Sequence, residues 1–485
     1  MRVLRLMSLH AIVLTVMLLD TTSLAKGRPG LAETYHDAAE RLLGAALTSD
    51  HAYTRMSELC DGIGHRLSGS ESLERAVEWS AQRMREDGLQ VRRQPVMVPR
   101  WVRGAESATL VEPREHPLHM LGLGRSVGTT PEGIIAEVVV VGSYEELAAL
   151  PDDAVRGRIV AYNVPFTSYG ETVRYRGSGA DSAAARGAVA MLLRSVGPVS
   201  LQTPHTGALR YRDAVPRIPA AAISIEDAAM LQRLSDRGVA MRVHLKMQAQ
   251  MLPDVVSHNV IGELRGREVP EEVVVLGGHL DSWDVGQGAH DDGGGCVISM
   301  EAVRLIAQLG LRPRRTLRVV LWTNEENGLR GGLAYRDSLG TAVEQHVAAI
   351  ESDGGVERPL GFAINALLPD TSLVDTVRLA RCMARAREIA PLLSGIDADR
   401  ILESGGGADI GPIMRRGVPG LAHRTVMDEY FHWHHTHADA LDKVDPRELR
   451  KNVAAMAIMA YVLADMPERL DDPLPSEGEK VQATK

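Results

Sequence analysis

The chain has 485 residues, of which 45% are hydrophobic and 24% are charged, and its formal net charge is -9. This length predicts two or more domains, because single hydrophobic cores stop growing at about 250–300 residues. The composition excludes a disordered or membrane-embedded chain, and the negative charge argues against nucleic acid or an anionic membrane as the partner.

The first residues have the pattern of an export signal. Arg2 and Arg5 precede an apolar run over residues 11–19, and the small-x-small sequence at residues 23–25 is typical of a cleavage site. The run is roughly half of the about 20 residues that cross a bilayer, so an uncleaved anchor is the less favoured alternative. We therefore predict a cleaved signal peptide over residues 1–25, a secreted or periplasmic chain and no stable membrane insertion.

The three cysteines have no paired spacing, which excludes a disulfide framework and a cysteine-based zinc site. They are Cys60, Cys296 and Cys382. A buried thiol is favoured for Cys296, which lies in an apolar segment of helical period. A single disulfide among the three stays open.

Two kinds of sequence alternate along the chain, and they predict a discontinuous first domain with a second domain inserted into it. The first domain is expected over residues 34–105 and 253–468, beginning with helices and a strand over residues 91–98 that Pro99 ends. Residues 106–252 lack clustered ligand-type residues and are interpreted as a non-catalytic α+β insert. Its strands are expected at 135–141, 159–162, 220–225 and 241–247, and its helices at 180–193 and 226–237. The sequence PHTG at residues 204–207 is interpreted as a surface turn, with a substrate contact as the less favoured alternative.

From residue 259 onward the pattern is that of strands alternating with helices. Strands at 273–276, 316–323 and 347–350 alternate with helices at 293–309 and 329–339. This rhythm predicts an α/β fold in which helices flank a mostly parallel sheet. A helix after residue 375, a glycine-rich loop at 405–407, a strand at 420–422 and a helix at 446–466 are expected next, and residues 469–485 are predicted to be a flexible tail.

Imidazole and carboxylate side chains follow the predicted parallel strands. His279 and Asp281 come after the first strand, Glu325 and Glu326 after the second, and Asp353 after the third. Because the carboxyl ends of strands in an open α/β sheet face one crevice, these residues should converge there. A divalent cation is the natural reason to gather an imidazole and several carboxylates, and the histidine-rich residues 431–439 offer a further ligand.

The order of these motifs resembles that of the dizinc exopeptidases, which include bacterial leucyl aminopeptidases and glutamate carboxypeptidase. The motifs are HLD at 279–281, DDGG at 291–294, EE at 325–326, ESD at 351–353 and HTHAD at 435–439. The likeness covers about residues 55–468. It implies a zinc peptidase fold with an inserted protease-associated-like domain, two zinc ions per chain and a homodimer.

The resemblance also implies the ligand set. His279 and Asp353 would hold one zinc ion, Glu326 and His435 the other, and Asp291 would bridge the two. Taken alone, Asp291 could be a helix cap and Asp353 a turn residue.

Further residues have predicted roles around these ligands. Glu325 and Glu326 are adjacent, so in extended backbone their side chains point apart and one must serve another purpose; the resemblance makes Glu325 the general base. Asp281 has a spacing suited to accepting the second N–H of the His279 ring, with a turn role as the alternative, and Asp439 is expected to play a related part near His435.

The residue that would stabilise the oxyanion is left open. Many relatives have a tyrosine directly before the last histidine ligand, where this chain has His434. Tyr430 and His437 are its rivals for this role. Asp409 is interpreted as the N-cap of the next helix rather than as a substrate contact.

The sequence thus predicts an exported dizinc exopeptidase that hydrolyses dipeptides or short peptides by attack of a metal-bridged water. Whether it acts as a carboxypeptidase, a dipeptidase or an aminopeptidase stays open. One alternative is a single-zinc glutaminyl-peptide cyclase on the same fold. The other is a non-catalytic receptor-like ectodomain, against which the intact ligand set argues.

Overall fold

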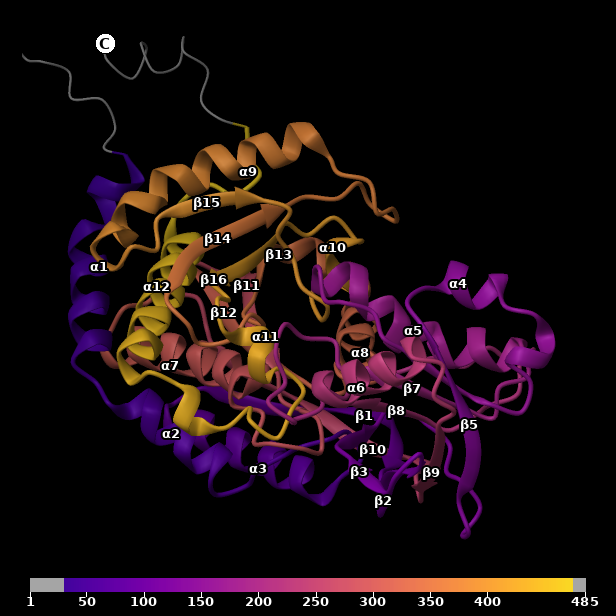
Figure 1. Ribbon diagram of the computed structural model, residues 1–485. Coiled ribbons are helices and arrows are strands. Elements are labelled where there is room, and N and C mark those ends of the chain that lie inside the picture. Colours follow the sequence, from indigo (N-terminus) through magenta and orange to yellow (C-terminus); the bar gives the residue numbers. More distant parts are fainter. Residues whose placement is uncertain (1–29, 474–485) are drawn as a thin grey trace, which may run out of the picture.

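The structure of the chain is a computed structural model that describes residues 30–473. The predicted signal peptide and most of the predicted tail lie outside these residues. The described chain contains two eight-stranded sheets, each with helices packed on it (Figure 1). Among the described residues, no helix combines the length and apolar character that a membrane span needs.

The first sheet is mixed and carries the predicted βαβ rhythm at its centre. Strands β12, β11, β13 and β16 run parallel, whereas β1, β10 and β14 join by antiparallel pairing. In spatial order the strands are β1 (Gln90–Val102), β10 (Gln250–Leu264), β12 (Arg315–Trp322), β11 (Val269–His279), β13 (His346–Glu351), β16 (Gly420–Thr425), β14 (Pro359–Asn365) and β15 (Arg400–Glu403).

Alternation along the central strands explains why helices cover both faces of this sheet. In β11, Val274 and Leu276 face one buried cluster, whereas Val273 and Val275 face another. The larger cluster includes side chains of α1 (Leu31–Leu47), α2 (His51–Cys60), α3 (Glu71–Glu86), α7 (Gly294–Gln308), α9 (Thr376–Ile389) and α12 (Pro446–Asp465). The smaller one includes side chains of α8 (Arg330–Leu339) and α10 (Gly411–Met414). The predicted mixed α/β class is confirmed.

The second sheet takes all its strands from residues 106–247. Helix α6 (Ile225–Asp236) contributes to the core on one face, and α4 (Tyr144–Ala149) and α5 (Tyr169–Ala185) to the core on the other. Trp283, which follows β11, packs into the α6 side and joins the two sheets. The strand order is β3 (His116–Leu118), β2 (Glu106–Glu112), β9 (Arg242–Met247), β5 (Ile134–Val141), β6 (Ile159–Tyr162), β7 (Ala190–Arg194), β8 (Ala220–Ile223) and β4 (Met120–Gly122).

Two predicted boundaries are wrong for identifiable reasons. The helix expected at 180–193 ends at Ala185, and Ala190–Arg194 forms β7, because a short apolar run fits a buried strand as well as a helix. The strand expected to stop at Pro99 continues to Val102, since the register shifts between Val98 and Arg100 and the proline lies where no ladder donor is needed.

The cysteine question is also answered, because Cys60, Cys296 and Cys382 are all free and buried. Cys296 lies on α7, as the buried-thiol interpretation requires.

Helix α7 begins so close to the end of β13 that its second residue has no room for a side chain. A Cβ on Gly295 would overlap with the carbonyl oxygen of Ser352 and the carboxylate of Asp292. We expect Gly295→Ala to destabilise the chain by about 2 kcal/mol or more, as overpacking does. Gly44→Ala in α1, where a Cβ meets nothing within 4 Å, should instead stabilise it by up to about 1 kcal/mol. Thermal unfolding of both variants checks this; equal shifts would contradict the close packing.

Candidate active site

The predicted site residues meet at the carboxyl edge of the first sheet. His279 is the last residue of β11, Glu325 and Glu326 follow β12, and Asp353 follows β13. Asp291 precedes α7, separated from β11 by a loop, and its peptide bond to Asp292 is cis. His434 and His435 come from the loop after α11 (Tyr430–Trp433).

Asp291 lies between two histidines. Its Oδ1 is 3.2 Å from Nε2 of His279, and its Oδ2 is 3.1 Å from Nε2 of His435. Asp353 Oδ1 is 3.6 Å from the same His279 nitrogen, and Glu326 Oε2 is 3.1 Å from the same His435 nitrogen. The five predicted ligands therefore form two sets that share Asp291.

The hydrogen bonds on the far side of each imidazole show what these sets can hold. Nδ1 of His279 is 2.8 Å from the backbone oxygen of Asp281, and Nδ1 of His435 is 3.2 Å from that of Thr206. A neutral imidazole that donates from Nδ1 carries a lone pair on Nε2, which here faces carboxylate oxygens. Acceptors that face one another need a proton or a metal ion between them.

The spacing and burial of these atoms fit a metal. Two ligands at about 2.0 Å from a tetrahedral ion lie about 3.3 Å apart, close to the nitrogen–oxygen distances above. Asp291 Oδ2 and Glu326 Oε1 are buried without a hydrogen bond to any described residue. Three overlapping groups of side chains have ligand atoms close enough for an ion: Asp291, His434 and His435; His279, Asp292 and Asp353; and His279, Asp291 and Glu326.

Asp292 was missed by the sequence reasoning, although it is adjacent to Asp291. Its Oδ2 accepts the backbone N–H of His279 (3.0 Å), and its Oδ1 accepts that of Gly295 (3.0 Å). Because backbone donors already occupy both oxygens, Asp292 positions the end of β11 against α7. Burial raises its pKa, and repulsion from Asp353 and Asp291 acts in the same direction.

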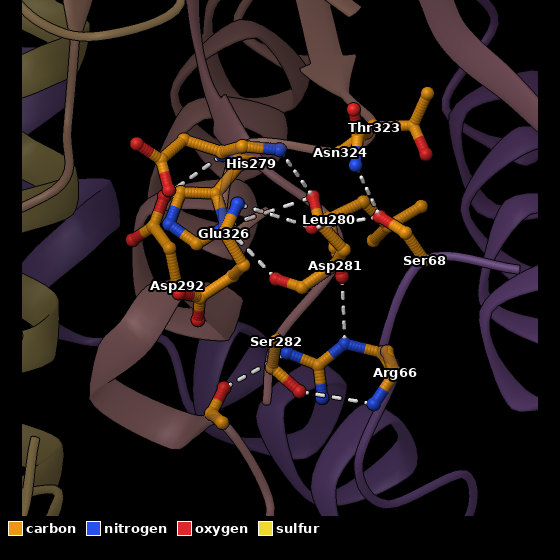
Figure 2. A network of polar contacts seen from close by, with 12 residues as sticks. Arg66, Ser68, His279, Leu280, Asp281, Ser282, Asp292, Thr323, Asn324 and Glu326 are labelled. Atoms are coloured by element: carbon orange, nitrogen blue, oxygen red, sulfur yellow. Dashed lines mark hydrogen bonds and ion pairs between the residues drawn. The ribbon is translucent and has the colours of Figure 1, made fainter. Parts of the chain in front are cut away.

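Asp281 differs from its predicted role. Its backbone oxygen, not its carboxylate, accepts from His279 Nδ1. The buried carboxylate instead accepts the backbone N–H groups of Glu325 (3.0 Å) and Glu326 (3.3 Å) and the hydroxyl of Ser68 (3.1 Å), as Figure 2 shows in part. Asp281, which follows β11, therefore fixes the backbone of the two glutamates that follow the neighbouring strand β12.

Asp439 and Arg66 hold the loop that leads to Asp291. The Asp439 carboxylate accepts the backbone N–H groups of Ala289, His290 and Asp291, so its role concerns Asp291 rather than His435. The fully buried guanidinium of Arg66, which no sequence pattern indicated, donates to the carbonyl of Leu280 (Figure 2). It also donates to the carbonyls of Gly64, Gln287 and Gly288.

Glu325 lies beside the two sets without belonging to either. Its backbone is fixed by Asp281, and its side chain is half-buried. Burial raises the pKa of Glu325 well above its usual value, and the carboxylates of Asp353 and Glu326 act in the same direction. A carboxylate with a raised pKa is a stronger base, which is what proton abstraction near neutral pH needs.

His434 and Tyr430 are also brought to the centre, whereas His437 is exposed. The rings of His434 and His435 stack 3.6 Å apart at 20°, and His434 Nε2 is 3.3 Å from Asp291 Oδ2. Nearly parallel rings direct their nitrogens along nearly parallel lines, so both cannot approach one ion in their ring planes. Burial lowers the pKa of His434 well below its usual value, and the nearby His435 adds to this effect, which leaves a neutral hydrogen-bond donor beside the site.

Two interpretations of surrounding segments are wrong. Residues 204–207 are not a surface turn, since His205 and Thr206 are buried and Thr206 donates its N–H to the backbone oxygen of His435 (3.0 Å). Asp409 is not a helix cap, because α10 begins at Gly411 after Ile410 and the buried Asp409 carboxylate makes no hydrogen bond to a described residue.

A cavity of about 400 Å³ adjoins the site at Asp353. The glycine-rich loop at 405–407 and β16 form its walls, and two arginines line it, Arg415 and Arg424. The guanidinium groups of Arg415 and Arg424 make no hydrogen bond or ion pair with any described residue.

Imidazoles and carboxylates gathered at the carboxyl ends of an α/β sheet, beside a cavity, define a metal-dependent hydrolase. Comparison with known proteins gives its family. Residues 259–460 match the model of peptidase family M28. Carboxypeptidase Q of Mus musculus is 43% identical over 440 residues, which cover 90% of this chain and 91% of that protein. Carboxypeptidase Q of Homo sapiens is 43% identical over 438 residues, which cover 90% of each chain.

Two solved structures are similar to this chain. A peptidase M28 precursor from Shewanella amazonensis has a TM-score of 0.84 at 32% identity, over 92% of this chain and 100% of that one. The zinc aminopeptidase BSAP from Bacillus subtilis shares the fold, with a TM-score of 0.64 at 21% identity over 87% and 97% of the two chains. The chain belongs to peptidase family M28 and is a zinc metallopeptidase.

Acidification should release the metal. Burial opposes the charged form of His279 and His435, but their carboxylate partners outweigh it and raise the pKa of both imidazoles well above the usual value. Protons therefore compete with zinc for Nε2 near neutral pH already, and more strongly as the pH falls. For each histidine proton that zinc must displace, the affinity for zinc should fall about tenfold for every unit by which the pH is lowered. Zinc content after equilibrium dialysis between about pH 8 and pH 5 checks this; a content that stays constant would contradict it.

Proposed function

We propose that the chain is a dizinc exopeptidase that hydrolyses dipeptides or short peptides. The observation that carries the proposal is the position of Asp291, whose two carboxylate oxygens face two different histidines. One zinc ion would be held by His279 and Asp353 and the other by Glu326 and His435, with Asp291 common to both. When bound, the ions supply Lewis acidity, which lowers the pKa of water and polarises the carbonyl under attack.

Glu325 is the general base of the proposed mechanism. Its carboxylate takes a proton from the attacking water and later gives a proton to the leaving amine. The raised pKa suits both steps, since the group must accept the proton and then hold it until the amine departs. Asp281 supports this role by holding the Glu325 backbone in place.

His434 is the proposed donor to the oxyanion. Burial lowers the pKa of His434 and so favours its neutral form. The ring lies beside Asp291, and its Nδ1 is buried without a hydrogen bond to a described residue. Tyr430, whose ring centroid lies 5.0 Å from that of His434, packs against the donor and orients it.

The cavity beside Asp353 favours substrates with a free carboxylate. Arg415 and Arg424 line it without acidic partners among the described residues, and a guanidinium binds a carboxylate through paired hydrogen bonds. A dipeptide or the carboxyl-terminal residue of a short peptide provides this group. The carboxypeptidase names of the relatives are consistent with such a preference.

The remaining parts of the proposal concern the chain as a whole. The insert over residues 106–252 is proposed to be a protease-associated-like domain, supported by a second sheet whose strands lie between Glu106 and Met247. Residues 34–105 and 253–468 would form the peptidase domain. Export through residues 1–25 and assembly as a homodimer stay predictions.

The zinc content per chain distinguishes the dizinc proposal, which requires two ions, from the single-zinc glutaminyl-peptide cyclase.

Replacing Glu325 by Gln should retain both zinc ions and reduce turnover of a dipeptide by about 10²–10⁴-fold, because only the proton acceptor is lost. Zinc analysis and steady-state kinetics of the same preparation measure both quantities. Glu344→Gln, a matched change at an exposed position, should leave kcat and zinc content unchanged. Unaltered turnover in Glu325→Gln would contradict the assignment of Glu325 as the general base.

Replacing Arg424 by Gln should raise KM for dipeptides with a free carboxylate by about 10–100-fold, the worth of a charge-assisted hydrogen bond. Carboxyl-amidated dipeptides should be cleaved equally by both proteins, since they lack the charged group. Arg416→Gln is the control, because Arg416 is exposed and does not line the cavity. An equal loss for free and amidated substrates would contradict carboxylate recognition.

A further inference from the structure

One residue of the second-sheet region contacts His435 at two points. The N–H of Thr206 donates to the His435 backbone oxygen (3.0 Å), and the Thr206 carbonyl lies 3.2 Å from Nδ1 of the His435 ring. His435 has a φ of 62°, a left-handed conformation that a non-glycine residue rarely adopts. The paired contact therefore fixes both the backbone and the ring of a proposed zinc ligand.

Arg176 of α5 completes this contact. Its Nη1 lies 3.3 Å from the Thr206 oxygen and 3.2 Å from His435 Nδ1, and its Nη2 donates to the Tyr169 hydroxyl (2.8 Å). The guanidinium is buried and has no acidic partner in the described chain. A guanidinium can only donate, so Arg176 donates to the Thr206 oxygen. A metal ion on Nε2 of His435 would leave the ring proton on Nδ1, and the Thr206 oxygen is the acceptor for that proton as well. The ring then donates from Nδ1 and keeps the Nε2 lone pair toward Asp291 and Glu326.

The residues around the Arg176 guanidinium leave room for it. Gly207 has a φ of 138°, and a Cβ there would overlap with the Arg176 guanidinium. On the other side of Arg176, the Tyr169 ring stacks on Phe431 at 5.1 Å and meets His434 edge-on at 5.1 Å. Helix α5 thus covers the histidine loop.

We infer that Arg176 and Thr206 are positioning residues for His435, so that retention of zinc by the Glu326 and His435 set depends on the insert. The inference rests on the proposed dizinc function and assigns a task to the insert: it fixes the tautomer and direction of one ligand. Second-sphere partners of this kind affect metal affinity by about 10–100-fold.

The test uses the full chain with Arg176→Gln and Arg176→Lys. Two zinc dissociation constants are measured by competition with a chromogenic chelator, and kcat, KM and Tm are measured beside them. Arg174→Gln is the matched control, an exposed arginine on the same helix.

In Arg176→Gln we expect one zinc ion to bind about 10–100-fold more weakly and the other as in the wild type. Excess zinc should restore kcat, and KM should stay unchanged. Arg176→Lys should recover part of the affinity, because an ammonium can also donate to the Thr206 oxygen. If Arg176→Gln does not fold, Gly207→Ala gives the same readout, since the added Cβ would displace the guanidinium.

Two results would overturn the inference. Unchanged affinity for both ions would exclude a positioning role, and unchanged affinity with a raised KM would assign Arg176 to substrate binding instead. A wild-type chain that binds fewer than two zinc ions would overturn the proposed dizinc function itself, which distinguishes that failure from a failure of the positioning role alone.

Discussion

The structure depends on the burial of many carboxylates at one edge of a sheet. Asp291 lies between two histidines, with Asp353 and Glu326 at the outer sides and Glu325 beside them. Burial raises the pKa of Glu326 to about 7, which reflects how poorly negative charge is tolerated there without compensation. A pair of cations would remove this penalty, and the imidazole lone pairs that face the carboxylates require a positive charge in the same places.

Three further carboxylates hold the proposed ligands in place, and all three do so by accepting hydrogen bonds from backbone N–H groups. Asp281 fixes the segment after β12, Asp292 fixes the end of β11 against α7, and Asp439 fixes the loop before Asp291. These interactions satisfy buried acceptors and buried donors together, so neither loses hydrogen bonding on leaving water. Asp281 and Asp439 accept from residues 44 and 148 positions away along the chain, whereas Asp292 joins β11 to the helix that follows it. The positions of the proposed ligands therefore depend on several parts of the fold rather than on a single loop.

Much of this site could be predicted because strand order determines where residues converge. The βαβ rhythm was strong enough to place His279, Glu326 and Asp353 at neighbouring strand ends, and the structure brings them together. Roles that depend on backbone groups could not be predicted from the sequence. Asp281 was expected to act on His279 through its carboxylate, but its carbonyl does so, and a carbonyl has no signature in the sequence.

The same limit explains Thr206 and Arg66. Thr206 contacts His435 through its backbone, so PHTG looked like a turn, and the carbonyls that Arg66 binds belong to residues more than 200 positions away, Gly64 excepted. Strand β1 was predicted only in part and strand β10 was not predicted, because many of their side chains face solvent and their apolar pattern is correspondingly weak.

Strands β1 and β10 also bear on how residues 106–252 could position the proposed metal ligand His435. The chain leaves the first sheet at the end of β1 and returns at the start of β10, and the two strands pair from Gln90 opposite Glu263 to Val102 opposite Gln250. Residues 106–247, which supply the second sheet, are therefore joined to the first sheet through a two-stranded ladder, interrupted by one register shift between Val98 and Arg100. Trp283, which follows the end of β11 that carries the proposed ligand His279, packs into the core of the second sheet. Because the ladder and Trp283 both hold the second sheet against the first, Thr206 lies at a fixed position beside His435, and its backbone carbonyl can orient the imidazole.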